Sequence, residues 1–191
     1  MLSLQRNWVH SAAILLAVLV SALPALSYGL TIEEAYAGIP HRRTVFNPSA
    51  SAISPAVKEE LRQIFTLAEQ ATILRVEGLA ALRAGRSQEL AQIINRYRAL
   101  AVSGPAARFS PSTQPVRELV LKAIDDHRAF FDEKLKQSAG KSAPNASFTS
   151  VINQASGKLH QAYDLLMKAF PAETAHNQAA FFDYLCALDF L

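Results

Sequence analysis

The chain has 191 residues and half of them are apolar, which indicates a globular domain rather than a disordered segment. The formal net charge is only +3 and the basic residues are scattered, so the charge does not support nucleic-acid binding. The chain has one cysteine, Cys186, which excludes an internal disulfide, a c-type haem motif and a metal site built from several thiolates.

Residues 1–27 are typical of a secretory signal peptide. A weakly basic start with Arg6 and His10 precedes a short apolar run, and Ala25 and Ser27 place small residues where a signal peptidase reads them. The apolar run is too short to span a hydrocarbon core of about 30 Å. We therefore expect cleavage before Tyr28, a periplasmic or secreted protein, and no membrane span afterwards. The alternative is an uncleaved anchor.

Residues 28–53 are expected to form a short helix followed by an extended loop. Thr31 and Glu34 have the spacing of a capping box, which predicts the start of the helix, and Gly38 marks its end.

The loop after this helix concentrates polar side chains in the sequence IPHRRT. It presents His41, Arg42 and Arg43, and two adjacent arginines can hold a carboxylate or a phosphate. One hypothesis is therefore a surface anion-binding loop. The alternative is a structural loop whose arginines bond to carbonyls at helix C-termini.

Residues 54–191 are expected to form the main helical domain. Helix periodicity, caps and breakers predict five helices. Four of them have the bounds Ser54–Gly85, Ser87–Val102, Gln114–Gln137 and Phe148–Phe170, and the fifth begins after Thr174. Short connections and the lack of strand patterns favour an all-α fold. We predict an antiparallel four-helix bundle with a short N-terminal helix and an additional apolar C-terminal helix.

The last predicted helix, AHNQAAFFDYLCALDFL, is apolar on nearly every side. Such a helix is either buried on several sides or covered by a partner, so an oligomer through this helix is one expectation. Cys186 lies in this helix, where a thiol is usually an inert part of the core.

Arg75 interrupts the apolar face of the first long helix. At about 100° per residue, its side chain points along the middle of the stripe formed by Leu61, Ile64, Ala68, Ala71, Leu79 and Leu82. A buried guanidinium without a partner costs several kcal/mol. Arg75 must therefore reach solvent from a groove, pair with a carboxylate, or face a cavity that receives an anion.

His127 is a second residue that can carry a positive charge, and it lies on the apolar face of the predicted helix Gln114–Gln137. On the last helix, His176 and Asp183 share one face. We expect Arg75 to pair with Asp183 or Asp189. The sequence thus predicts a buried polar cluster of Arg75, His127, His176 and Asp183, which binds a ligand or joins the helices.

The function that these residues favour is binding rather than catalysis. We expect an exported helical-bundle protein without catalytic activity that binds a partner protein or a small anion. The alternative is a metal-binding or acid–base enzyme using His127, His176 and a carboxylate in the bundle interior. No His–Glu metal motif occurs, so we expect no cofactor and no metal site. A purely structural subunit, docked through its last helix, is the third hypothesis.

Overall fold

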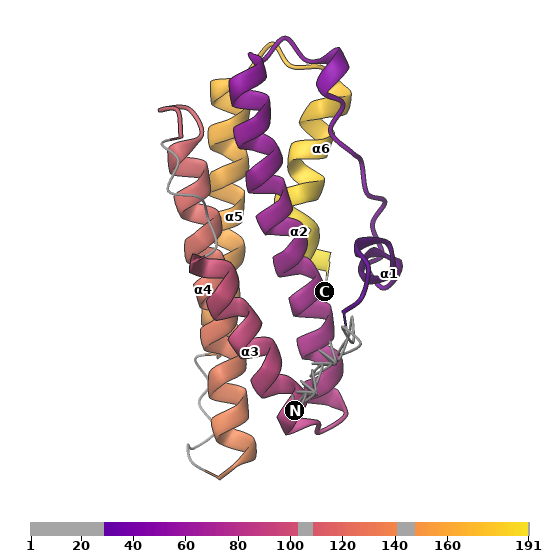
Figure 1. Cartoon of the computed structure of the whole chain (residues 1–191), viewed down its shortest axis with the longest axis vertical. Helices are drawn as coiled ribbons and strands as arrows, with labels where there is room; N and C mark the ends of the chain where they lie inside the picture. Colours follow the sequence, from indigo (N-terminus) through magenta and orange to yellow (C-terminus); the bar gives the residue numbers. More distant parts are fainter. Residues whose placement is uncertain (1–28, 103–108, 141–147, 191) are drawn as a thin grey trace, which may run out of the picture.

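The computed structural model describes residues 29–102, 109–140 and 148–190. The expected signal peptide lies outside these ranges. Within them the fold is all-helical without a strand, and six α-helices pack against one another (Figure 1). The helices are α1 (Ile32–Ala37), α2 (Pro55–Arg83), α3 (Ser87–Val102), α4 (Gln114–Ser138), α5 (Phe148–Ala169) and α6 (Ala175–Cys186), with 3-10 turns η1 (Pro48–Ala50) and η2 (Ala187–Phe190).

The helix ends lie close to where local sequence signals predict them. Thr31 and Glu34 form both bonds of the capping box at α1. The Ser54 side chain accepts a bond from the Val57 N–H, with a proline at the first helical position. Gly85 follows α2 with a φ of 68°, a conformation that glycine adopts at little cost. A connection of three residues, 84–86, then makes α2 and α3 antiparallel neighbours.

The core lies between the long helices. α4 packs against α3 and α5, while α2 contacts α3, α4 and α6. Large side chains that are almost completely buried include Tyr97, Phe131, Phe181, Leu61, Ile64, Ile124 and Leu166. Each apolar side chain of this size contributes about 1.5–3 kcal/mol when it is fully buried. A continuous core therefore holds the helices together.

Residues 29–53, here called the N-terminal segment, run beside α6 and α2 (Figure 1). The Asn177 side chain exchanges two hydrogen bonds with the backbone of Asn47, and His176 Nε2 lies 2.9 Å from the Val45 carbonyl oxygen. The segment contains η1, where a loop was predicted, because the Asn47 side chain accepts bonds from the next backbone N–H groups.

The apolar surface of α6 is covered within the chain. Ala180, Phe181, Leu185 and Cys186 are all buried, in contact with α2, α5 and the N-terminal segment. Of the two expectations for this helix, burial on several sides is the one that the structure confirms. None of the helices in the described ranges combines the length and the apolar composition needed to cross a bilayer.

Candidate functional site

A pocket of about 420 Å³ contains both of the polar residues that were predicted to point inward. We call it the Arg75 pocket. Its walls come from α2, α4, α5 and η2, and its lining residues are Arg75, His127, Ile152, Asn153, Ser156, Leu159, His160 and Asp189. A volume of this size is typical of small-molecule sites.

Arg75 is a buried cation that has no counter-ion in the described ranges. Its side chain is only 7 % exposed, and Cζ lies 4.7 Å and 5.4 Å from the ring centroids of Phe130 and Phe131. Nη1 is buried and has no hydrogen-bond partner among the described residues. Burial lowers the pKa of the guanidinium from its ordinary value, and the charge of Arg83 acts in the same direction. An arginine nevertheless stays protonated at neutral pH.

The aromatic side of this site depends on the absence of a side chain at Gly78. A Cβ atom at this position would lie under 3.0 Å from three atoms of the Phe131 ring. The ring therefore rests directly against the backbone of α2, one turn beyond Arg75. Cation–π contact with the two phenylalanines stabilises the guanidinium but gives its N–H groups no acceptor.

His127 is buried beside Arg75 with both ring nitrogens unpartnered. Its side chain is 3 % exposed, and neither Nδ1 nor Nε2 has a hydrogen-bond partner among the described residues. Burial, and then the charge of Arg75, lower the pKa of His127 to about 3. The imidazole is therefore neutral at pH 7 and offers one N–H donor and one acceptor. The inward orientation predicted for both residues is confirmed.

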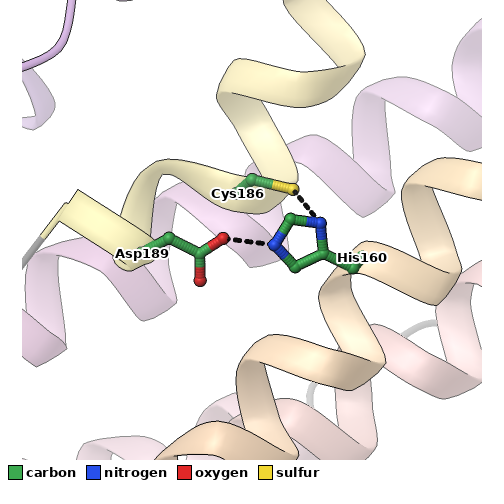
Figure 2. A group of neighbouring side chains, drawn as sticks. All are labelled: His160, Cys186 and Asp189. Carbon is green, nitrogen blue, oxygen red and sulfur yellow. Dashed lines mark hydrogen bonds and ion pairs between the residues drawn. The ribbon is translucent and has the colours of Figure 1, made fainter.

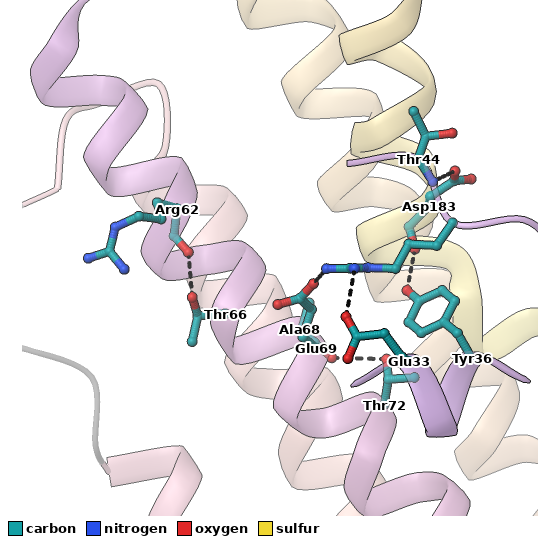
Figure 3. A network of polar contacts seen from close by, with 10 residues as sticks. Glu33, Tyr36, Thr44, Arg62, Thr66, Ala68, Glu69, Thr72 and Asp183 are labelled. Atoms are coloured by element: carbon teal, nitrogen blue, oxygen red, sulfur yellow. Dashed lines mark hydrogen bonds and ion pairs between the residues drawn. The ribbon is translucent and has the colours of Figure 1, made fainter. Parts of the chain in front are cut away.

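Asp183 and His176 lie outside the Arg75 pocket. The Asp183 carboxylate lies 2.6 Å from His41 Nε2. It accepts a 2.6 Å bond from the Thr44 N–H, and the Tyr36 hydroxyl donates to the Asp183 carbonyl (Figure 3). We call these four residues the Asp183 network. His176 contacts Val45 instead and does not line the pocket.

The ion pair expected for Arg75 is therefore wrong for Asp183, whose carboxylate binds the N-terminal segment. The second expected partner, Asp189, lies 2.6 Å from His160 Nε2 and accepts a 2.6 Å bond from the Ser156 hydroxyl. In the part of the chain that the structure describes, Arg75 forms no ion pair. What joins α6 to the rest of the fold at Asp183 is the returning N-terminal segment rather than Arg75.

Two of the three basic side chains in the IPHRRT loop bind carboxylates of the same chain. His41 binds Asp183. Arg43 forms ion pairs with Glu69 and, at 3.7 Å, with Glu33, two residues that Figure 3 places beside the network. The Arg43 guanidinium contacts carboxylates rather than the carbonyls considered as the alternative, and only Arg42 is exposed. This arrangement favours a structural role for His41 and Arg43 over joint binding of an external anion.

Sequence reasoning missed the residues that complete the pocket on α5. Asn153, Ser156 and His160 are separated by three and four residues, a spacing that places them on one helix face. This spacing could be read from the sequence. The position of this helix face opposite Arg75 could not be predicted, because periodicity along one helix gives no information about its rotation relative to another helix.

Comparison with protein-family models, with curated proteins and with solved structures gives no match to this chain. The function therefore has to be inferred from the geometry and chemistry of the pocket.

Proposed function

We propose that this is an exported protein whose α2–α5 form a four-helix bundle, and that it binds a small organic anion in the Arg75 pocket without catalysing a reaction. The observation that carries this proposal is the buried Arg75 guanidinium. Its Nη1 has no partner among the described residues, and the residue lines a pocket large enough for a ligand. Export is inferred from residues 1–27.

The physical argument begins with the cost of the unpaired charge. Removing a guanidinium from water without an acceptor is unfavourable by several kcal/mol. An anion in the pocket supplies that acceptor, and a hydrogen bond to a charged group contributes about 1.5–3 kcal/mol. A natural chain that retains a buried arginine in this state gains a function from it, because a methionine of similar shape would avoid the cost.

The other lining residues indicate the class of anion. Among the described residues that line the pocket, Arg75 is the only arginine or lysine, and Asp189 repels a second negative group. The Asn153 side chain and the accepting lone pairs of the Ser156 hydroxyl offer hydrogen bonds, whereas Ile152 and Leu159 offer apolar surface. A short monocarboxylate, with one charged end and a small carbon body, matches this lining better than sulfate or phosphate.

A protein partner is less well supported as the ligand. The apolar face of α6, which suggested docking, is covered by α2, α5 and the N-terminal segment. The large apolar side chains that are exposed in the described ranges are Leu30 and Val45, in the N-terminal segment, and Val102, at the end of α3.

The proposal is tested by calorimetric titration of the purified protein with acetate, butyrate, phosphate and sulfate. We expect butyrate to bind best, and the Arg75→Met variant to lose this binding. Arg62→Met is the matched control, because Arg62 is an exposed arginine on the same helix and pairs with Glu59 at its surface. Absence of binding to all four anions, or equal binding by wild type and Arg75→Met, would overturn the assignment.

Export has its own test. Mass spectrometry of the protein recovered from a secreting host should give a chain that starts at Tyr28. Recovery of the intact chain in the membrane fraction would instead support the uncleaved anchor.

A further inference from the structure

Three side chains able to ligate a metal converge where the end of α6 meets α5 (Figure 2). They are His160, Cys186 and Asp189, and one ligand atom from each lies within 4.8 Å of the others. His160 Nδ1 is 3.8 Å from Cys186 Sγ, and His160 Nε2 is 2.6 Å from Asp189 Oδ2. In the described ranges no other group of three such residues comes together.

The contact with Asp189 fixes which nitrogen of His160 is available. An ionised carboxylate only accepts hydrogen bonds, so in the neutral ring Nε2 carries the proton and Nδ1 carries the lone pair. This lone pair faces the Cys186 sulfur. The Ser156 hydroxyl donates to the other oxygen of Asp189 and holds the carboxylate in place. A carboxylate that binds the far nitrogen of a metal-ligating histidine is a recurring arrangement in zinc proteins.

The space between sulfur and nitrogen has the dimensions of a zinc site. With Zn–S near 2.3 Å and Zn–N near 2.0 Å, a separation of 3.8 Å between the two ligand atoms gives an angle of about 120° at the metal. Both side chains therefore reach one ion without moving. We infer that Cys186 Sγ and His160 Nδ1 bind Zn²⁺, with Asp189 as the outer partner that orients His160.

Binding would release the thiol proton to solvent and leave the ion with open coordination positions. His160 and Asp189 also line the Arg75 pocket, so these positions are next to the proposed anion site. The ion would enter from the side of His160, because the His160 side chain is 49 % exposed while Cys186 is fully buried.

A catalytic thiol is the competing interpretation of a Cys–His–Asp group, and the surroundings of Cys186 disfavour it. Burial, and then the charges of Asp189, Asp164 and Asp183, raise the pKa of the thiol to about 12. A nucleophilic cysteine requires the opposite shift, because it must ionise without help, whereas a metal ion that binds the sulfur displaces the thiol proton itself. The same three carboxylates attract a divalent cation.

The experiment uses Co²⁺ as a spectroscopic probe of the purified, reduced protein. We expect one equivalent of Co²⁺ to produce a near-ultraviolet thiolate-to-cobalt charge-transfer band, which Zn²⁺ then removes by competition. Cys186→Ser should abolish the band. His160→Gln should lower the Co²⁺ affinity at least tenfold, and Asp189→Asn should lower it by about tenfold, as expected for an outer partner.

The matched control is His176→Gln, which changes an exposed histidine away from the group and should leave the band unchanged. A folded wild-type protein that shows no thiolate band, or a band that survives in His160→Gln, would overturn the inference. The result is independent of the anion proposal, because Arg75→Met should retain the cobalt band whether or not it binds anions.

Discussion

The Arg75 pocket and the Asp183 network are two solutions to the same problem, a charged side chain on an apolar helix face. Arg75 is 7 % exposed and Asp183 is 4 % exposed. Asp183 receives a partner at each carboxylate oxygen, from His41 and from the Thr44 N–H. From the part of the chain that the structure describes, Arg75 receives the faces of two aromatic rings and no acceptor for its Nη1.

This difference distinguishes a structural role for Asp183 from a role in binding for Arg75. A buried charge whose partners come from the chain itself fixes how two segments pack. A buried charge that lines a pocket and has no acceptor there can still bind a ligand. Mutation of the first kind of residue should lower the stability of the protein, and mutation of the second kind should weaken ligand binding.

The largest effect is expected at the Asp183 network. Asp183→Ala leaves the Thr44 N–H and the His41 ring without their acceptor, so the free energy of unfolding should fall by about 3 kcal/mol. Urea denaturation measures this change. Asp164→Ala, at an exposed aspartate on α5, is the control and should cost less than about 0.5 kcal/mol. Equal losses of unfolding free energy in Asp183→Ala and Asp164→Ala would contradict the structural role of Asp183.

The next effect concerns the aromatic side of the Arg75 pocket. Gly78→Ala forces a methyl group into the Phe131 ring, so we expect a loss of about 2 kcal/mol in unfolding free energy. Gly157→Ala is a matched control inside another helix, where the added Cβ meets nothing within 4 Å. Because alanine favours helices more than glycine, this variant should gain up to about 1 kcal/mol. A gain in both variants would show that Phe131 is not held against α2.

The third prediction uses the pH dependence of stability. The pKa of His127 is about 3 in the folded chain and near its ordinary value of 6.5 in the unfolded chain. As the pH falls below 6.5, the unfolded chain therefore binds a proton at this residue that the folded chain does not. Stability should fall on acidification, by about 1 kcal/mol between pH 6 and pH 5.

Urea denaturation at several pH values measures this slope, and comparison with His127→Gln isolates it from other titrating groups. The variant should lose the slope between pH 6 and pH 5, whereas His176→Gln, at an exposed histidine, should keep it. An unchanged slope in His127→Gln would mean that the imidazole can be protonated in the folded protein, for example by opening toward solvent.

The smallest effect on stability is expected at Arg75 itself. Arg75→Met removes an unpaired buried charge, and the loss of its cation–π contacts offsets only part of that gain, so the unfolding free energy should rise, by less than about 1 kcal/mol. Thermal denaturation without added anion measures this. A loss above about 2 kcal/mol would place Arg75 with Asp183 as a structural residue.

Local sequence signals predicted much of the fold. The caps at Thr31, Ser54 and Thr174 and the break at Gly85 lie where they were expected, because a cap depends only on residues within one turn of the helix end. The inward direction of Arg75 and His127 was also correct. It follows from the 3.6-residue period, which fixes every side chain relative to the axis of its own helix.

The sequence by itself determined where the helices begin and end and which way Arg75 and His127 point, and the tertiary structure alone decided which side chains meet. Asp183 was recognised as a costly residue on an apolar helix, but its partners come from a segment about 140 positions earlier that returns along α6. The meeting of His160 with Cys186 and Asp189 depends in the same way on the rotation and offset of α5 relative to the chain end. Periodicity carries no information about these two quantities, because they are set by packing between helices rather than along one.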